Sequence, residues 1–212
     1  MSADVLIAVR GGRSAKSRCA KVLAPAVRER LVEAMLRDML DVALKAPGVR
    51  AVHVVTPTAS LARVAHERGA RAILEEDPID LNGAFDLGRA RIAAKSALVL
   101  LPGDLPALDP RELANVIAAW RPGGIVLVAA RGDGGTGALV LGADSAMPTC
   151  FGINSFTRHQ AAAAAAGLPL KILEAPGLAF DVDRPSDLEI AKGLSGRTAA
   201  LLRSLVREEI ES

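Results

Sequence analysis

Short apolar runs alternate with longer amphipathic runs along nearly the whole chain, and this alternation constrains the fold more than any other feature. A short run of aliphatic and β-branched residues has the length of a buried strand, while apolar positions that recur every three or four residues form one face of a helix. Strands and helices that alternate in this way build βα units around a largely parallel sheet. The sequence therefore predicts an α/β fold.

The expected strands and helices can be placed along the chain. Strands are predicted at Val5–Val9, Ala51–Val55, Arg71–Leu74, Ala97–Leu101, Ile125–Ala130, Ala138–Leu141 and Leu170–Ala175. Helices are predicted at Pro25–Ala46, Ser60–Arg68, Gly83–Lys95, Pro110–Trp120, Ser155–Ala166, Pro185–Lys192 and Thr198–Ile210. The chain has 212 residues, no internal repeat and no long linker rich in Gly, Pro and Ser, so residues 1–212 are predicted to form a single domain.

The composition excludes several classes of protein. Half of the residues are hydrophobic and 24% are charged, which favours a buried core over disorder. Four Phe, one Trp and no Tyr offer few rings on which bases could stack, and a net charge of +2 is too balanced for a polybasic surface. We therefore expect no nucleic-acid partner.

The cellular setting follows from the cysteines and the first residues. Cys19 and Cys150 are too few for a disulfide framework or a four-cysteine zinc site, which favours a reducing compartment. The opening run carries Asp4 and is too short for a signal peptide or a membrane span. We therefore expect an unprocessed, soluble, cytoplasmic protein with no membrane partner.

The last predicted helix leaves one question open. It carries a set of apolar side chains at helical spacing: Leu201, Leu202, Leu205 and Val206. Such a face fits either the core of the protein or a contact in a homodimer.

The loop after the first strand is a candidate ligand site, because open α/β sheets bind ligands beyond the carboxyl ends of their strands. It reads Arg10-Gly11-Gly12-Arg13-Ser14-Ala15-Lys16-Ser17-Arg18. The glycines let the backbone approach an anion closely. Three of the cations, Arg13, Lys16 and Arg18, can neutralise charge on a polyphosphate. The loop matches neither the Walker nor the GxGxxG pattern, but it predicts phosphate binding, with a solvated basic turn as the alternative.

Acidic side chains follow two later segments. Asp104 comes at the end of an almost wholly apolar strand, and Asp181 and Asp183 are spaced so that an extended segment places both on the same side. Carboxylates so arranged are the hard oxygen ligands that Mg²⁺ prefers, with substrate phosphates and water completing its shell. The sequence therefore predicts a magnesium site; the alternatives are a turn residue for Asp104 and a helix cap for Asp183.

Two middle loops are also unusual. The glycine-rich segment 132–137 indicates either a backbone pressed against a ligand or a plain hairpin. The segment 150–156 leads into a helix whose first amides would favour an anion, with Ser155 able to cap it or to donate a hydrogen bond. His159 lies one helical turn after Ser155, but a Ser-His pair on one helix without a G-x-S-x-G elbow disfavours hydrolase chemistry.

Taken together, these segments resemble a known family, the 2-phospholactate (phosphoenolpyruvate) guanylyltransferases that start side-chain assembly of the deazaflavin coenzyme F-420. The resemblance extends from Val5 to about Leu188. Its blocks are Ala15-Lys16-Ser17-Arg18, Leu81-Asn82-Gly83-Ala84, Gly103-Asp104-Leu105-Pro106, Gly135-Thr136, Phe151-Gly152-x-x-Ser155-Phe156-x-x-His159 and Pro176-Gly177-Leu178-x-x-Asp181-x-Asp183-x-Pro185-x-Asp187-Leu188.

The resemblance implies a fold and a reaction. The fold would be a Rossmann-like α/β/α sandwich with a mostly parallel, mixed sheet, as in the nucleotide-diphospho-sugar transferases. The reaction would join GMP from GTP to a small phosphorylated carboxylic acid (2-phospho-L-lactate, phosphoenolpyruvate or a phosphoglycerate) and release pyrophosphate. No general base is required, because the acceptor phosphate is already an anionic nucleophile at neutral pH.

The same resemblance assigns roles to residues. Lys16, Arg18 and Asp104 would be catalytic. Asp104, Asp181 and Asp183 would hold Mg²⁺, and Thr136, Gly152 and Ser155 would receive the phospho-acid. Asn82 would lie beside the nucleotide. Apart from the resemblance, the phosphate-binding pattern of the loop after the first strand predicts nucleotide contacts from Gly11, Gly12 and Arg13, beside Lys16.

Three positions depart from the family, and two other functions stay open. Cys19 stands where the family commonly has Leu, Asp80 where it has Gly, and Gly137 where it has Asn. The last two adjoin the expected substrate pockets, so the base or acceptor preference could differ. The alternatives are a nucleotidyltransferase for another acceptor, such as a molybdopterin or a sugar phosphate, and a non-catalytic nucleotide-binding domain.

Overall fold

A mixed sheet with helices on both faces organises the computed structural model, which describes residues 1–12, 15–77, 79–93, 96–132 and 134–210, the last five by their backbone only. The strands are β1 (Ala3–Ala8), β2 (Val49–Thr56), β3 (Arg71–Leu74), β4 (Ala97–Pro102), β5 (Ile125–Ala129), β6 (Thr136–Gly142) and β7 (Leu170–Ile172). The helices are α1 (Pro25–Ala43), α2 (Ala59–Glu67), α3 (Leu81–Arg91), α4 (Pro110–Ala119), α5 (Ser155–Ala165), α6 (Pro176–Ala179), α7 (Pro185–Lys192) and α8 (Arg197–Ile210), with a 3-10 turn η1 at Ser17–Cys19.

The predicted strands and helices are all present, and the differences lie at their ends. The helix predicted at Gly83–Lys95 instead spans α3, because the Asp80 carboxylate accepts a hydrogen bond from the Gly83 amide (2.7 Å) and starts the helix earlier, while Ile92 takes an extended conformation and ends it. The short elements η1 and α6 were not predicted, since three or four residues are too few to show a periodic pattern.

The sheet has seven strands in the order β3-β2-β1-β4-β6-β5-β7. β6 pairs antiparallel with both β4 and β5, and the remaining pairs are parallel. The predicted α/β sandwich with a mostly parallel, mixed sheet is thereby confirmed. The chain runs outward from β1 to β3 and then returns to β4 on the other side of β1. The connections that follow β1 and β4 therefore lead in opposite directions along the sheet, which marks a topological switch point, where open sheets bind ligands.

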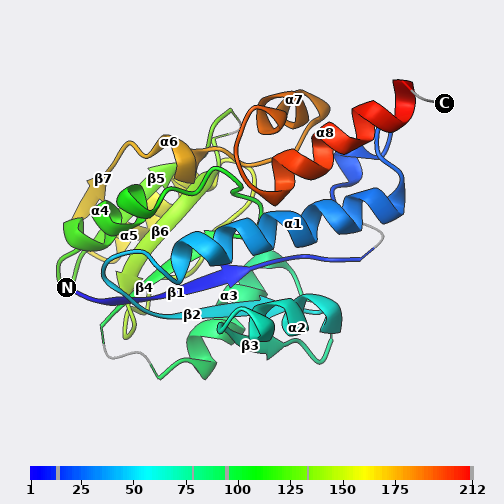
Figure 1. Ribbon diagram of the computed structural model, residues 1–212. Helices are drawn as coiled ribbons and strands as arrows, with labels where there is room; N and C mark the ends of the chain where they lie inside the picture. The colour runs from blue at the N-terminus through cyan, green and yellow to red at the C-terminus, as the bar shows by residue number, and fades with distance from the viewer. Residues whose placement is uncertain (13–14, 78, 94–95, 133, 211–212) are drawn as a thin grey trace.

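Helices cover both faces of the sheet (Figure 1), and successive side chains of the central strands pack against different helical layers. In β1, for example, Val5 and Ile7 pack in the cluster under α1, α2, α4, α7 and α8, whereas Leu6 and Ala8 pack in the cluster under α3 and α5. This alternation is the period of two of an extended chain, and burial on both faces explains why the strands are almost wholly apolar.

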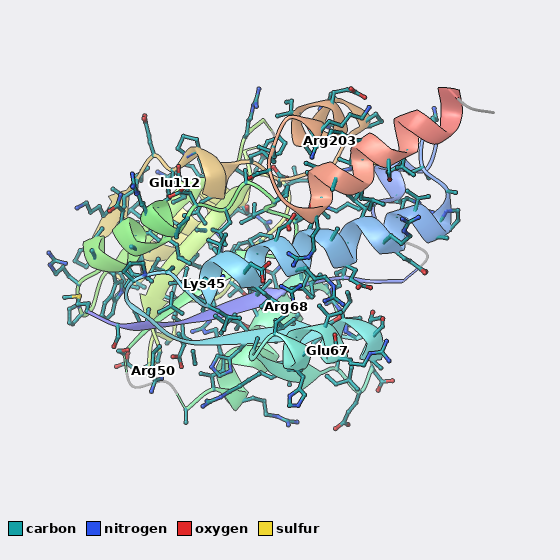
Figure 2. All side chains as sticks on the ribbon, viewed as in Figure 1. Lys45, Arg50, Glu67, Arg68, Glu112 and Arg203 are labelled. Carbon is teal, nitrogen blue, oxygen red and sulfur yellow. The ribbon has the colours of Figure 1, made fainter. Side chains whose placement is uncertain are left out.

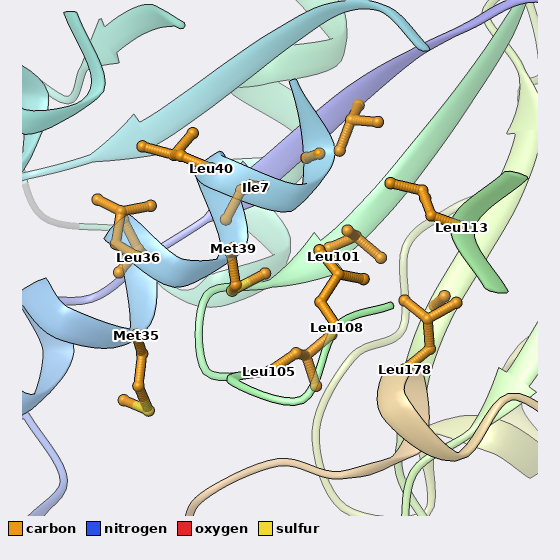
Figure 3. Packing of buried hydrophobic residues seen from close by; sticks show 14 of the residues in the cluster. Ile7, Met35, Leu36, Met39, Leu40, Leu101, Leu105, Leu108, Leu113 and Leu178 are labelled. Carbon is orange, nitrogen blue, oxygen red and sulfur yellow. The ribbon is translucent and has the colours of Figure 1, made fainter. Parts of the chain in front are cut away.

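The loop after β4 is anchored by the core. Leu101, Leu105 and Leu108, which flank Asp104 in the chain, belong to the same apolar cluster as Met35 and Met39 of α1 (Figure 3). Leu101 and Leu105 are fully buried. Asp104 is therefore held at a fixed place by the packing of its neighbours.

The last helix packs against the core. The Asp38 carboxylate of α1 accepts hydrogen bonds from the backbone amides of Arg197 (2.9 Å) and Thr198 (2.8 Å), which caps the start of α8. Leu202 is buried, and Leu201 and Leu205 pack beside it. Of the two possibilities for this apolar face, the core contact is the one that the structure shows, and the homodimer stays a prediction.

None of the helices in the described part of the chain is long and apolar enough to cross a membrane.

Candidate active site

Two adjoining cavities lie at the carboxyl ends of β1 and β4. The first, of about 340 Å³, is lined by Ala8, Val9, Arg10, Ala15, Lys16, Ser17, Arg18, Val32, Leu81, Pro102, Gly103, Asp104 and Asp183. The second, of about 240 Å³, is lined by Arg18, Leu81, Pro102, Asp104, Leu105, Ala130, Gly135, Thr136, Phe151, Gly152, Ile153, Ser155, Asp181 and Asp183. Arg18, Asp104 and Asp183 line both cavities, together with Leu81 and Pro102, so charged side chains form much of the wall that the two cavities share.

Lys16 is the centre of this charged wall. Its Nζ lies 2.5 Å from Asp104 Oδ2 and 3.3 Å from Asp183 Oδ1. Burial alone would lower the pKa of the Lys16 ammonium, but the two carboxylates outweigh it and hold the pKa above its ordinary value. Lys16 is therefore a permanent cation that neutralises carboxylates from two distant loops.

Arg18 supplies a second cation to the same wall. Its Nη1 lies 2.6 Å from Asp183 Oδ2, and about half of its side chain is exposed. Cys19, one of the departures from the family, lies beneath, with its Sγ 3.6 Å from the Asp183 carbonyl oxygen, and burial raises the pKa of its thiol. The exposed guanidinium is thus open to an anion, whereas the thiol serves packing.

The loop that carries Lys16 is anchored to α1 by a hydrogen bond. Arg28 of α1 is buried and donates a hydrogen bond from Nη1 to the Ala15 carbonyl (2.8 Å). Gly11 has no room for a side chain, because a Cβ there would lie 2.5 Å from Thr58 Oγ1, and Gly12 has a φ of 85°. The predicted nucleotide contact Arg13 lies outside the described residues.

Arg10, the first cation of this loop, is directed away from the charged wall. Its Nη1 lies 2.9 Å and 2.6 Å from the two carboxylate oxygens of Glu75, and its Nη2 donates to the carbonyls of Ile79 and Asp80. Arg10 therefore ties the loop after β1 to the segment that precedes α3. Since Asp80 caps α3, that departure from the family has a structural role in this chain.

The acidic residues are brought together by one backbone hydrogen bond. The Val182 amide donates to the Asp104 carbonyl (3.1 Å), which places Asp181 and Asp183 on either side of that bond. The alternative reading of Asp183 as the cap of α7 is wrong, because the Asp187 carboxylate accepts from the amides of Asp183 (3.0 Å) and Arg184 (2.7 Å) instead. Asp183 is thereby free of a capping role and faces Lys16 and Arg18.

Glu112 of α4 fixes the chain just before these acids, a role that no local sequence signal indicated. Its Oε2 accepts hydrogen bonds from the amides of Gly177 (2.8 Å) and Leu178 (3.2 Å) in α6, beside which it lies in Figure 2. The carboxylate satisfies amides that a four-residue helix leaves unpaired. Glu112 therefore fixes the position of α6, from which the chain continues to Asp181 and Asp183.

The acidic side chains of the site offer oxygen ligands of the kind that a divalent metal prefers. The Oδ1 atom of Asp104 is buried and has no hydrogen-bond partner among the described residues, a costly arrangement that a cation would relieve. No group of three His, Cys, Asp or Glu side chains within the described part of the chain stands ready to hold an ion by itself. Since Mg²⁺ is commonly held by one or two carboxylates together with substrate phosphates, the residues fit an ion that arrives with a nucleotide.

The second cavity gathers the three residues predicted to receive the phospho-acid, Thr136, Gly152 and Ser155. Ser155 Oγ lies 3.1 Å from Thr136 Oγ1, and His159 Nδ1 lies 2.9 Å from the same oxygen. Ser155 is the first residue of α5 and does not cap it, because Asn154 occupies the N-cap position. The Ser-His pair is therefore linked through Thr136, which is not the arrangement of a nucleophile with its base.

Asn82, predicted to sit by the nucleotide, bonds with the wall of the second cavity. Its Oδ1 accepts from the Phe151 amide (2.7 Å) and its Nδ2 donates to the Phe151 carbonyl (3.1 Å). Both ends of the side-chain amide are thus engaged with one backbone residue. Asn82 fixes the segment that leads to Gly152, and its contact with a nucleotide stays a prediction.

β5 and β6 pair antiparallel as a hairpin, and the Ala130 amide donates a hydrogen bond to the Gly135 carbonyl (2.9 Å) at its end. The glycine-rich segment 132–137 lies there, and its residue 133 is outside the described residues. Gly137, where the family commonly has Asn, packs against α6. A Cβ at this position would lie 1.9 Å from the Leu178 carbonyl oxygen. Any side chain at residue 137 would therefore push away the segment that carries the acidic residues.

Gly137→Ala is accordingly expected to destabilise the fold by about 1–3 kcal/mol through overpacking. Thermal unfolding should show a lower midpoint than wild type. Gly193→Ala is the matched control, since Gly193 has an ordinary helical φ of −78° and its Cβ would meet only the Ile190 carbonyl at 3.3 Å. Equal midpoints for Gly137→Ala and wild type would show that α6 yields easily and would contradict the close approach.

Comparisons with known proteins find a matching family model and named relatives. A family model described as "Guanylyl transferase CofC like" matches residues 3–208. The chain is 46% identical over 211 residues to the 3-phospho-D-glycerate guanylyltransferase of Phenylobacterium zucineum, covering 96% of each protein. It is 38% identical over 195 residues to the phosphoenolpyruvate guanylyltransferase of Sphaerobacter thermophilus, covering 91% of this chain and 94% of that protein.

The fold has a solved counterpart as well. A crystal structure from Desulfovibrio desulfuricans, described as a nucleotide-diphospho-sugar transferase, superposes with a TM-score of 0.77 at 20% identity and covers 98% of each chain. The likeness supports the predicted relation to the nucleotide-diphospho-sugar transferase fold.

Proposed function

This chain belongs to the CofC-like guanylyl transferase family, and from that premise we propose that it transfers GMP from GTP to the phosphate of 3-phospho-D-glycerate or phosphoenolpyruvate, in the biosynthesis of coenzyme F-420. The observation that carries the proposal is the shared wall of the two cavities, where Lys16, Arg18, Asp104 and Asp183 meet. A reaction between two anionic substrates needs a pocket for each and charge compensation where they join.

The reaction balances without a protein base. An oxygen of the acceptor phosphate attacks the α-phosphorus of GTP and forms a new phosphorus–oxygen bond. The bond from the α-phosphorus to the oxygen that bridges to the β-phosphorus breaks, and pyrophosphate leaves with that electron pair. Because the attacking oxygen is already ionised at neutral pH, the protein has only to align the two substrates and offset their charges.

The two cavities divide these tasks. The first, beside the loop after β1, receives GTP, with Lys16, Arg18 and the amides of Gly11 and Gly12 toward its phosphates; Arg13 and Asn82 are proposed as further nucleotide contacts. The second receives the phospho-acid against Thr136, Gly152 and Ser155. Lys16 and Arg18, on the wall between them, are in reach of the charge that develops during transfer.

Asp104, Asp181 and Asp183 are the residues that would hold Mg²⁺. When bound, the ion would offset charge on the nucleotide phosphates and on the departing pyrophosphate. The buried, unpartnered Asp104 Oδ1 supports this assignment. When the ion binds, Asp104 and Asp183 would either lose their contacts with the Lys16 ammonium or contact the ammonium and the ion at the same time.

The experiment that tests the function is pyrophosphate release by the purified protein with Mg²⁺. GTP, CTP, ATP and UTP are each paired with 3-phospho-D-glycerate, phosphoenolpyruvate, 2-phospho-L-lactate and a sugar phosphate. Release is expected with GTP and a three-carbon phospho-acid, and 3-phospho-D-glycerate is the first acceptor to test because the relative that is 46% identical bears its name.

The same matrix separates the competing functions. Turnover only with a sugar phosphate, or with a molybdopterin added as a further acceptor, would replace the proposed acceptor class. Binding of GTP without release in any combination would favour a non-catalytic nucleotide-binding domain.

A further inference from the structure

A buried chain of hydrogen bonds runs behind the second cavity. The Cys150 amide donates to His159 Nε2 (2.9 Å), His159 Nδ1 lies 2.9 Å from Thr136 Oγ1, and Ser155 Oγ lies 3.1 Å from that same oxygen. The exposed fraction is 4% for Thr136 and zero for Ser155 and His159. Because these side chains are shielded from solvent, the donors and acceptors of the three bonds can be assigned by chemistry.

The backbone fixes the tautomer of the imidazole. A peptide N–H can only donate, so His159 Nε2 must be unprotonated and the ring proton must sit on Nδ1. Nδ1–H therefore donates to Thr136 Oγ1. Burial, assisted by the charge of Arg158, lowers the pKa of His159 to about 4, so the ring is neutral at neutral pH.

This assignment determines what the two hydroxyls can do. Thr136 Oγ1 accepts a hydrogen bond from His159 Nδ1–H, and a second hydrogen bond joins the hydroxyls of Thr136 and Ser155. The pair has two hydroxyl hydrogens, of which that bond uses one. The other is left to donate, and Thr136 and Ser155 both line the second cavity. The cavity wall is thereby held as a hydrogen-bond donor toward an anion.

The same imidazole also steadies the neighbouring backbone. Its contact with the Cys150 amide fixes the chain two residues before Gly152, which has a φ of 116°, and the Phe151 ring packs edge-on against the imidazole with centroids 4.9 Å apart. One side chain thus connects both parts of the wall, the hydroxyl pair and the segment with Gly152.

We propose that His159 is a positioning residue for the acceptor: through its Nδ1–H bond to Thr136 and its Nε2 bond to Cys150, it holds the second cavity in the arrangement that donates to the phospho-acid. The inference rests on the proposed function, since it assigns the second cavity to that substrate. His159 does not touch the reacting atoms and takes no proton during transfer.

Substitutions at residue 159 distinguish the contribution of the hydrogen bond to Thr136 from that of the bond to the Cys150 amide. His159→Asn places an amide nitrogen near the position of Nδ1 and keeps a donor for Thr136, whereas His159→Leu removes both bonds. His159→Leu is expected to raise the KM for the phospho-acid by up to about 10-fold and to leave the KM for GTP unchanged, because the hydroxyl pair loses the hydrogen bond that orients it. His159→Asn should recover most of that loss. His66→Leu, on the exposed side of α2, is the control and should change neither KM.

Binding and spectroscopy keep the inference testable apart from turnover. Calorimetry with 3-phospho-D-glycerate and with phosphoenolpyruvate, in the presence of GTP, should show weaker acceptor binding to His159→Leu. The ¹⁵N spectrum of the wild-type imidazoles should show His159 protonated on Nδ1 alone, which needs no variant to fold. Protonation on Nε2, an equal rise in both KM values, or a His159→Asn variant no better than His159→Leu would overturn the proposal.

The outcomes also distinguish this inference from the proposed function. Acceptor binding that depends on His159, without pyrophosphate release by the wild type, would leave the inference standing and reject the transfer reaction. Release by the wild type with unchanged acceptor affinity in His159→Leu would do the opposite. Neither binding nor release with any acceptor would reject both.

Discussion

Asp104→Asn is expected to lower the turnover number by roughly 10²–10³-fold, the effect typical of removing one strong electrostatic contact at a reacting centre. The change keeps the size and shape of the side chain but removes its charge. It affects both the ion pair with Lys16 at 2.5 Å and the buried Oδ1 that is proposed to hold Mg²⁺. The measurement is pyrophosphate release at saturating GTP and acceptor over a range of Mg²⁺ concentrations.

The fold of Asp104→Asn should persist, because the neighbouring leucines still pack in the core. Circular dichroism and the thermal midpoint check this point. Asp144→Asn is the matched control, since Asp144 is exposed and lines neither cavity. An Asp104→Asn protein with full turnover and the same Mg²⁺ dependence as wild type would end the metal assignment. Asp183→Asn is expected to behave in the same way, with the additional loss of the Arg18 contact.

Lys16→Met is expected to lower turnover by a similar roughly 10²–10³-fold factor and, in the absence of nucleotide, to strengthen Mg²⁺ binding. The two effects have opposite signs because the ammonium has two roles. It offsets phosphate charge during transfer, but in the free protein it neutralises the Asp104 and Asp183 carboxylates that would otherwise attract the ion. Calorimetric titration with MgCl₂ measures the second effect, and pyrophosphate release measures the first.

Stability provides an independent readout for Lys16→Met. Removing one partner of a partly buried ion pair leaves carboxylates without compensation, so the variant should unfold at a lower temperature than wild type when no metal is added. Added Mg²⁺ should raise its thermal midpoint more than that of wild type. Lys45→Met is the control, because Lys45 is exposed in the turn just after α1 (Figure 2), and it should match wild type in all three assays. Weaker Mg²⁺ binding by Lys16→Met would show that Lys16 and the ion do not compete.

Most of the strands and helices could be predicted from the local pattern of apolar residues in the sequence. The alternation of strand-length and helix-length runs predicted an α/β sheet, and β3 and α7 begin and end at the predicted residues. This succeeded because strands buried on both faces are apolar throughout, whereas helices show a single apolar face. The family resemblance implied a mixed sheet but not which strand is antiparallel. Only the structure assigns that direction to β6, since an apolar run carries no sign of its direction.

The candidate site was accessible in part. The loop with Lys16 and the acid Asp104 could be found because each directly follows a buried strand, where open sheets bind ligands. Asp181 and Asp183 could be found by their spacing, which places both on one side of an extended segment. The roles of Glu112, Asp187 and His159 could not, because each depends on a partner that is near only after folding. The Ser155–His159 spacing suggested a direct pair, and the intervening Thr136 lies on a different element, β6.

The sequence by itself determined which segments are strands, which are helices, and where charge gathers at strand ends, since these properties depend on residues within one or two turns of each other. Only the tertiary structure decided that Lys16 lies between Asp104 and Asp183, residues that are 88 and 167 positions away in the chain. That contact depends on the strand order, which places β4 beside β1 and brings the loops after them together. Pairing between distant strands is chosen by the packing of the whole sheet, so no local pattern could have specified the charged wall on which the proposed chemistry depends.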